Sequence, residues 1–256
     1  MKYETAGDPV TGCKWTRKST EKIARELARA RIYVSPNTAV ISVDTKSRLL
    51  IGRFHQKGRR WGQEPIKVLD HDFPSDAQGV GIPYGIYDTY RKEGFVCVGT
   101  SRDTGQFAVD AIRTWWLKSG RDHYPQAEEV LVLADSGGSN GYRIRLWKYQ
   151  LQTAFCDRVG LKVRVCHYPP GASKWNPIEH LLFSFVSKNW EAEPLVSYER
   201  VLKSIRTTKT KTGLRVRACL LDRKYEKGIK ISDDQMRKVN LKRYRVNPEW
   251  NYTIAP

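Results

Sequence analysis

Apolar residues recur along this chain with two different periods, one typical of strands and the other of helices. Short runs of apolar and β-branched residues predict strands. The first two runs, residues 40–45 and 48–54, are close enough to form a hairpin or successive antiparallel neighbours. Further strands are predicted at 85–90, 95–99, 129–135 and 161–166. The run 129–135 is continuously apolar up to Asp135, which is typical of a strand buried on both faces in a parallel sheet.

Three segments repeat apolar residues at helical spacing. The first, residues 103–118, repeats them every four residues. The second follows a Gly/Ser/Asn loop at 136–141 and carries a stripe of Ile144, Trp147, Leu151 and Phe155. The third begins at Pro177 and is expected to bury Ile178, Leu181, Leu182 and Phe185. Because helices alternate with strands, the pattern predicts an α/β protein with a sheet flanked by helices.

The first 39 residues are predicted to form a separate, truncated helix-turn-helix. Ser19 or Thr20 can cap a helix with apolar residues at helical spacing. Ser35 and Pro36 then resemble the N-cap and first turn of a second helix. This second helix has almost no room, because the first strand begins at residue 40.

The charge balance narrows the class of partner. Forty-five Lys and Arg stand against 27 Asp and Glu, a net charge of +18, and seven of the cations lie in 200–217 without any acid. Such an excess favours a polyphosphate such as DNA, since each neutralised phosphate releases counterions. A solvated cationic face, as in some ribosomal or membrane-surface proteins, is the alternative. The apolar runs are too short to span a bilayer, so we expect a cytoplasmic protein with no membrane partner.

The number and spacing of the cysteines argue against two common kinds of cysteine site. The five cysteines are odd in number, scattered and never in a Cys-x-x-Cys pair, which argues against a disulfide scaffold and a zinc finger. At 256 residues and 40% hydrophobic, the chain is long enough to bury a core without them. We therefore expect reduced cysteines that serve mostly in packing.

Three acids stand where the predicted fold can bring them together. Asp44 interrupts the alternation of the first strand, Asp135 ends the strand 129–135, and Glu179 lies in the first turn of the third helix. Acids at strand ends in α/β sheets face the crevice where ligands bind. Three carboxylates at one edge repel one another unless divalent cations lie between them. The pattern predicts a site for two Mg²⁺ ions, with Mn²⁺ as a substitute.

Each of these acids also has a structural explanation. Asp44 can start a turn, and Asp135 can form an Asx turn that opens the loop 136–141. Asn176 to Glu179 fits the positions from N-cap to N3, so Glu179 can instead close a capping box. The residues alone leave both explanations open.

Five strings of residues carry a resemblance to a known family. They are Val43-Asp44-Thr45-Lys46, Asp70-His71-Asp72-Phe73, Ile82-Pro83-Tyr84-Gly85-Ile86-Tyr87-Asp88, Ala134-Asp135-Ser136-Gly137-Gly138-Ser139-Asn140-Gly141 and Ser173-Lys174-Trp175-Asn176-Pro177-Ile178-Glu179-His180. Through them, and over nearly all of residues 40–254, the chain resembles the Rhodopirellula-type DDE transposase family, insertion-sequence transposases distantly akin to mariner elements and retroviral integrases. The resemblance implies a ribonuclease-H-like mixed sheet flanked by helices, with Asp44, Asp135 and Glu179 as an acidic triad. Forty-three residues separate the second acid from the third.

The resemblance also implies a domain order and an activity. The segments are a DNA-binding helix-turn-helix remnant at 1–39, a catalytic domain at 40–206 and a basic C-terminal extension at 207–256. The implied reaction is hydrolysis of a DNA phosphodiester at a transposon end, followed by in-line attack of the freed 3′-hydroxyl on target DNA, assisted by two Mg²⁺. Double-stranded DNA is then the partner, and a homodimer assembled on DNA is expected.

Six residues are candidate DNA contacts. They are Lys174, Trp175, Asn176, His180, Lys209 and Lys211. Packing is the alternative for Trp175, and a core or capping role is the alternative for Asn176 and His180. Residues 207–212 also read as a solvated connector, and His71 is expected to serve its loop.

One region departs from the family pattern. In the family the recognition helix continues and a linker precedes the catalytic strand, whereas here Ala39 abuts Val40. The DNA-reading element is therefore expected to be internally shortened, with weakened binding to transposon ends. This leaves two alternatives to a transposase: a structure-selective nuclease on the same fold, and a non-catalytic DNA-binding remnant.

Overall fold

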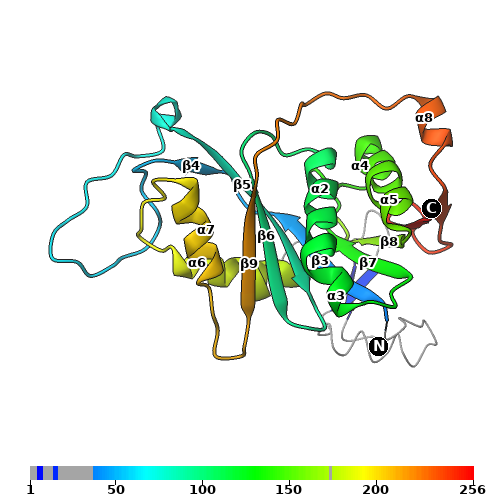
Figure 1. Cartoon of the computed structure of the whole chain (residues 1–256), viewed down its shortest axis with the longest axis horizontal. Coiled ribbons are helices and arrows are strands. Elements are labelled where there is room, and N and C mark those ends of the chain that lie inside the picture. Colours follow the sequence, from blue (N-terminus) through cyan, green and yellow to red (C-terminus); the bar gives the residue numbers. More distant parts are fainter. Residues whose placement is uncertain (1–4, 8–13, 17–36, 173–174) are drawn as a thin grey trace.

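A mixed sheet of nine strands forms the centre of the described structure (Figure 1). The computed structural model describes residues 5–7, 14–16, 37–172 and 175–256. Along the sheet the strands follow the order β10-β11-β8-β7-β3-β5-β6-β9, and β4 pairs with β5 beside that path. Their bounds are β3 (Ala39–Thr45), β4 (Leu49–Ile51), β5 (Gly79–Asp88), β6 (Glu93–Gly99), β7 (Glu129–Ala134), β8 (Lys162–His167), β9 (Arg215–Leu221), β10 (Leu241–Arg243) and β11 (Asn251–Ile254).

The middle of the sheet is parallel, and its register decides where the strand ends meet. Strand β7 pairs in parallel with β3 on one side and with β8 on the other. Val43 of β3 lies opposite Ala134 of β7. The residues that follow this pair are Asp44 and Asp135, so the two acids leave neighbouring strands at the same edge. Strands β5 and β6 continue the sheet in antiparallel fashion beyond β3.

Helices cover both faces of this sheet. One group packs on the larger core, with β7, β8 and alternate residues of β3 such as Ile41 and Val43. Its members are α2 (Gly105–Trp115), η2 (Trp116–Gly120), α3 (Arg121–His123), α4 (Arg145–Gln150), η3 (Leu151–Cys156) and α5 (Asp157–Val159). A second group packs on the other core, against parts of β4, β5, β6 and β9. It consists of η5 (Glu179–Phe183), α6 (Ser184–Asn189) and α7 (Tyr198–Arg206), and Figure 1 shows α6 and α7 on the far side of β6 and β9 from α2.

Strand alternation then assigns the face of each residue in β3. Ile41 and Val43 point into the larger core, so Ser42 and Asp44 point to the opposite face. That face is the one covered by η5, whose first residue is Glu179. The alternation therefore directs Asp44 toward the helix that carries the third acid.

The expected hairpin between the first two strands is wrong. Strands β3 and β4 do not pair with each other: both pair antiparallel with β5, which begins at Gly79, earlier than the expected residue 85. Pro83 is tolerated within β5 because β3 ends opposite Tyr84 and β4 begins opposite Gly81. The proline thus lies between the two pairings, where its missing N–H breaks no ladder.

The residues that the third predicted helix buries differ from the expected set. Leu181, expected to be buried, is 43% exposed, whereas Phe183 and Val186 are buried together with Ile178 and Leu182. The cause is the π-helical geometry of η5, whose wider turn shifts the face that each following residue presents. Similar π-helical turns, η2 and η3, interrupt the other two predicted helices.

The segment expected to be a C-terminal extension contributes strands at both edges of the sheet. Strand β9 pairs in parallel with β6, and β11 pairs antiparallel with β8 and with β10. Between them lies α8 (Asp233–Arg237), which begins with a capping box between Ser232 and Gln235. Residues 207–256 are thus part of the main sheet rather than an appendage.

Little of the expected helix-turn-helix falls on described residues. The first predicted helix and the start of the second, Ser35 and Pro36, lie outside them, while residues 37–39 are described and lead into β3. The other described pieces are β1 (Thr5–Gly7) and β2 (Lys14–Thr16), which pair antiparallel. Among the described helices, none combines the length and apolar character needed to cross a bilayer.

Candidate active site

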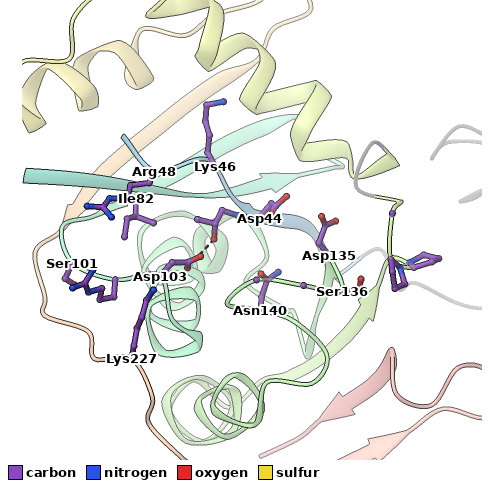
Figure 2. Close-up of a pocket in the computed structure, with 17 residues that line it drawn as sticks. Asp44, Lys46, Arg48, Ile82, Ser101, Asp103, Asp135, Ser136, Asn140 and Lys227 are labelled. Atoms are coloured by element: carbon purple, nitrogen blue, oxygen red, sulfur yellow. Dashed lines mark hydrogen bonds between the residues drawn. The ribbon is translucent and has the colours of Figure 1, made fainter. Parts of the chain in front are cut away.

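Two of the predicted acids line one hollow at the edge of the sheet. The hollow has a volume of about 580 Å³ and lies where β3 and β7 end. Asp44 and Asp135 line it together with a third acid, Asp103, from the segment between β6 and α2. Figure 2 shows these three carboxyl groups around one space, with Asn140 below them. We call this space the acidic hollow.

Glu179 stands beside the acidic hollow rather than in its lining. It is half-buried, and it is the first residue of η5. Its charge nevertheless acts on Asp44 and on Asp135, and it is within hydrogen-bonding reach of Asp44. The three carboxyl groups predicted from the sequence are therefore close enough to influence one another.

This proximity has an electrostatic cost. Burial, the charge of Asp135 and the charge of Glu179 together raise the pKa of Asp44 to about 8, against a hydrogen bond from the N–H of Thr45 that lowers it. The pKa of Asp135 is also raised, by burial first and by Glu179, against a hydrogen bond from Asn176 that favours its charged form. The folded protein thus keeps acids in a place that disfavours their negative charge, which a bound cation would relieve.

The donor set matches a hard divalent cation in chemistry. Carboxylate oxygens are the ligands that Mg²⁺ prefers, and Asp44, Asp135 and Glu179 would supply them. Within the described residues, no group of three or more His, Cys, Asp and Glu side chains is arranged closely enough to hold a metal ion as they stand.

The carboxyl group of Asp135 is held by a buried amide. Asn176 has no exposed surface, and its Nδ2 donates to Asp135 Oδ1 at 3.1 Å. Its Oδ1 accepts a hydrogen bond from the hydroxyl of Ser42, and that same hydroxyl accepts one from the backbone N–H of Ile178 at 3.3 Å. These bonds join β3, the Asp135 loop and the start of η5.

This arrangement corrects the expectation for Asn176. A side chain without exposed surface cannot contact DNA, so Asn176 is not a DNA contact in this structure. Its side-chain amide forms hydrogen bonds with Asp135 and Ser42 and does not cap the helix that follows. In the structure the Asn176 side chain holds the carboxyl group of Asp135, the acid that follows β7.

A second chain of hydrogen bonds supports the backbone of Asp135. His167 at the end of β8 lies with Nδ1 2.8 Å from the Asp135 carbonyl oxygen and Nε2 3.1 Å from the Tyr252 hydroxyl. Burial lowers the pKa of His167 to about 4, so the ring is neutral at pH 7. Nδ1 then donates to Asp135 while Nε2 accepts from Tyr252, whose oxygen also accepts from Trp147 Nε1 at 2.9 Å.

Cations share the lining of the acidic hollow with the acids. Four of them line it: Lys46, Arg48, Arg102 and Lys227. Lys46 stacks over the rings of Phe183 and Trp190 at 5.5 and 5.9 Å. Burial lowers the pKa of Lys46, and the charge of Glu179 partly offsets this. A space lined by both acids and cations can hold a phosphodiester and a divalent cation side by side.

Sequence reasoning missed two polar residues of this hollow. Asp103 accepts a hydrogen bond from Thr45 at 3.3 Å, and burial raises its pKa. It was expected inside a helix, but that helix begins at Gly105 with Thr104 as its N-cap. The amide nitrogen of Asn140 is buried without a hydrogen-bond partner at the same hollow. Only the motif around Asp135 signalled Asn140, and nothing in the pattern signalled Asp103.

The other candidate DNA contacts are placed as follows. Trp175 is 36% exposed and His180 is exposed, and neither lines the acidic hollow. Lys209 and Lys211 are exposed in the turn between α7 and β9. Lys174 lies outside the described residues. His71 serves its loop, as expected, with Nε2 2.7 Å from the carbonyl oxygen of His55.

The edge acids and the mixed sheet define an α/β protein with a carboxylate site where parallel strands end. A family model of the Rhodopirellula transposase DDE domain matches residues 29–256. The chain belongs to this family of DDE transposases, and the predicted resemblance and fold class are confirmed. No curated protein matches the chain.

Two solved structures resemble the fold at low identity. One is a Mos1 transposase paired-end complex with left transposon end, with a TM-score of 0.45, 14% identity and coverage of 72% of this chain. The other is a Mos1 mariner paired-end complex with Mn, with a TM-score of 0.42, 15% identity and coverage of 70% of this chain. This chain spans 50% of the length of each.

Proposed function

We propose that this chain cleaves DNA strands at the ends of an insertion sequence and joins them to target DNA. Asp44, Asp135 and Glu179 are the acids that carry the reaction. The observation that supports this most is the pairing of Val43 with Ala134, which brings two of the three acids to one edge within electrostatic reach of the third.

The proposed cofactor is a pair of Mg²⁺ ions, for which Mn²⁺ can substitute. Asp44, Asp135 and Glu179 would hold them, and the bound ions would supply charge stabilisation for phosphoryl transfer. The chain's own residues have three further tasks. Asn176 holds the Asp135 carboxylate in place. Asp44 must release its proton before it can act as a ligand, and Arg48, Arg102 and Lys227 bind phosphates of the incoming strand.

The proposed substrate is double-stranded DNA, bound by a homodimer. The net charge of +18 supports a polyphosphate partner. The cations that line the acidic hollow support entry of the backbone rather than of the bases, because guanidinium and ammonium groups pair with phosphate oxygens.

A strand-transfer assay tests the proposal. Duplexes with pre-cut transposon ends are incubated with a supercoiled target plasmid and Mg²⁺ or Mn²⁺. Joined products are expected, and they should disappear in Asp135→Asn and with EDTA. Cleavage without joining would instead indicate a nuclease, and binding without either would indicate a non-catalytic remnant.

A further inference from the structure

A second hollow lies apart from the catalytic acids, where the loop between β4 and β5 meets α6 and α7. It has a volume of about 420 Å³. Its lining comprises Arg59, Arg60, Lys188, Asn189, Glu191, Glu193, Arg200, Lys203, Ser204 and Thr207. We call it the basic hollow. In Figure 1 the loop, η1 (Pro74–Asp76) included, projects from the sheet on the side of α6 and α7.

The loop is attached to the helices by backbone contacts. The N–H of Ala192 donates to the carbonyl oxygen of Lys57 at 3.0 Å, and the N–H of Gly52 donates to that of Leu195 at 2.9 Å. Gly58 has a φ of +111°, a backbone conformation that residues with a Cβ rarely adopt. A glycine at this position therefore lets the loop lie against the turn after α6, which fixes Arg59 and Arg60 beside the helical cations.

The charges of the basic hollow are unequal and mostly unpaired. It contains five cations and two carboxylates. Glu193 pairs with Arg60 at 3.0 Å and also with Arg200. Among the described residues no acid lies within ion-pair distance of Arg59, Lys188 or Lys203, and all three are exposed. Exposed cations of this kind are available to an external anion.

One side chain of the acidic hollow contacts a residue that is next to the basic hollow in the sequence. Lys46 of the acidic hollow stacks on the ring of Trp190, and Trp190 directly follows Asn189 of the basic hollow. DNA carries phosphates at regular intervals along its backbone, so a single duplex can present phosphates to cations of both hollows.

We propose that the basic hollow binds backbone phosphates of duplex DNA that flanks the strand in the acidic hollow. The inference rests on the proposed function for the identity of that DNA. Arg59, Lys188 and Lys203 contact phosphates, while Glu193 holds Arg60 and Arg200 in place. Because these contacts are to phosphates, they add affinity without selecting sequence.

A pair of matched double variants tests this site. Lys188→Ala/Lys203→Ala removes two exposed lysines from the basic hollow. Lys162→Ala/Lys238→Ala removes two exposed lysines from the first residue of β8 and the end of α8, at the other end of the molecule (Figure 1). Both variants change the net charge by the same amount, so a difference between them reports position rather than charge.

The measurement is fluorescence anisotropy of a labelled duplex at several salt concentrations, in EDTA. For the variant of the basic hollow, the slope of log K against log salt should become shallower by about 2, roughly one for each phosphate that a lysine no longer neutralises. Its affinity at low salt should fall roughly tenfold, and the control should retain both the slope and the affinity. Equal changes in the two variants, or none, would overturn the proposal. A loss confined to single-stranded oligonucleotides would overturn the assignment to duplex DNA.

Two further measurements separate folding and chemistry from binding. Thermal melting checks that the double variant folds; if it does not, Arg59→Gln on the exposed loop replaces it, with an expected change in slope of about 1. The same binding series in an Asp135→Asn background should show the same loss. Absence of strand transfer in the unmodified chain would count against the proposed function and leave this binding result standing.

Discussion

The two hollows place their charges in opposite environments. The acids of the acidic hollow are half-buried, and burial together with mutual repulsion raises the pKa values of Asp44 and Asp135. The unpaired cations of the basic hollow are exposed to water, where a charge costs little. Buried carboxylates that destabilise one another indicate a bound cation that would offset their charge. Exposed cations instead indicate long-range attraction of an anionic partner. Replacing acids should therefore affect chemistry, and replacing the exposed lysines should affect binding and its dependence on salt.

The largest expected effect is that of Asp135→Asn. The amide keeps the shape of the side chain and can still bond to Asn176, but it removes a metal ligand with negative charge. Cleavage and joining should be lost, while affinity for duplex DNA should be retained or raised because one negative charge near phosphate disappears. Rates from the strand-transfer assay and affinities from anisotropy provide the two readouts.

Asp103→Asn is the matched control in the same hollow. Asp103 is also half-buried and its pKa is also raised, but Glu179 is not among the charges that shift it. Its activity should remain within about tenfold of the original, equivalent to about 1.4 kcal/mol in the barrier. If Asp103→Asn were inactive and Asp135→Asn active, the assignment of the acids would have to be reversed.

The next effect concerns the amide that holds Asp135. Asn176→Ala leaves Asp135 without its donor and leaves the buried hydroxyl of Ser42 without an acceptor. We expect a roughly 10- to 100-fold loss of activity, the usual range for a group that orients a metal ligand. Unfolding in urea should show a loss of about 1–3 kcal/mol, because buried polar groups remain unpaired.

The dependence on Mg²⁺ separates positioning from mere stability. If Asn176 positions Asp135, the variant should need more Mg²⁺ for half-maximal activity, and a higher concentration should restore part of the rate. Ser42→Ala, which removes the outer member of the network, should show a smaller change of the same kind. A variant that is less stable yet shows an unchanged Mg²⁺ requirement would limit Asn176 to a packing role.

A third effect is on stability and should depend on pH. The pKa of Asp44 is raised in the folded protein to about 8 from 3.8. The folded state therefore binds more protons than the unfolded state between these values, and stability falls as pH rises from about 4 through 8. Asp44→Asn removes this dependence, so in EDTA at pH 8 its melting temperature should be higher than that of the unmodified chain, by an amount that corresponds to at least about 1 kcal/mol of stability.

Added Mg²⁺ sharpens this test. It should raise the melting temperature of the unmodified chain more at pH 8 than at pH 6, because a carboxyl that keeps its proton is a poor ligand. Asp44→Asn should lose most of this response. An identical response to Mg²⁺ at both pH values would show that deprotonation of Asp44 is not linked to metal uptake.

Two acids of the acidic hollow, Asp44 and Asp135, could be predicted because each lies at the end of a predicted strand. An acid that interrupts one strand and another that ends the next apolar run were expected to meet, and the register of Val43 with Ala134 explains why they do. Their electrostatic contact with Glu179 arises because Ser42 and Asp44 face the side of the sheet covered by η5. Strand alternation is local enough to be predicted from sequence, whereas the pairing of β3 with β7 joins segments far apart in the chain and was not predicted.

The missed residues depend on contacts that no local period encodes. Asp103 reaches the acidic hollow from a segment outside any strand or helix, and it meets Thr45 across 58 residues. The basic hollow requires a loop near residue 58 to lie on a turn near residue 192, a contact made by backbone atoms and helped by the positive φ of Gly58. The exposure of Leu181 follows from a π-helical turn, which the expected helical period does not anticipate.

The smallest expected effect is at the turn between α7 and β9. Lys209 and Lys211 remain predicted DNA contacts; both are exposed, and neither lines the acidic or the basic hollow. In Lys209→Ala/Lys211→Ala the slope of log K for duplex DNA against log salt should become shallower by at most about 2. The change should be smaller if the solvated turn does not hold both lysines against the DNA backbone. At saturating DNA the joining rate should not change, because no catalytic group has moved. An unchanged slope would identify the turn as a solvated connector and confine the basic DNA-binding surface to the two hollows.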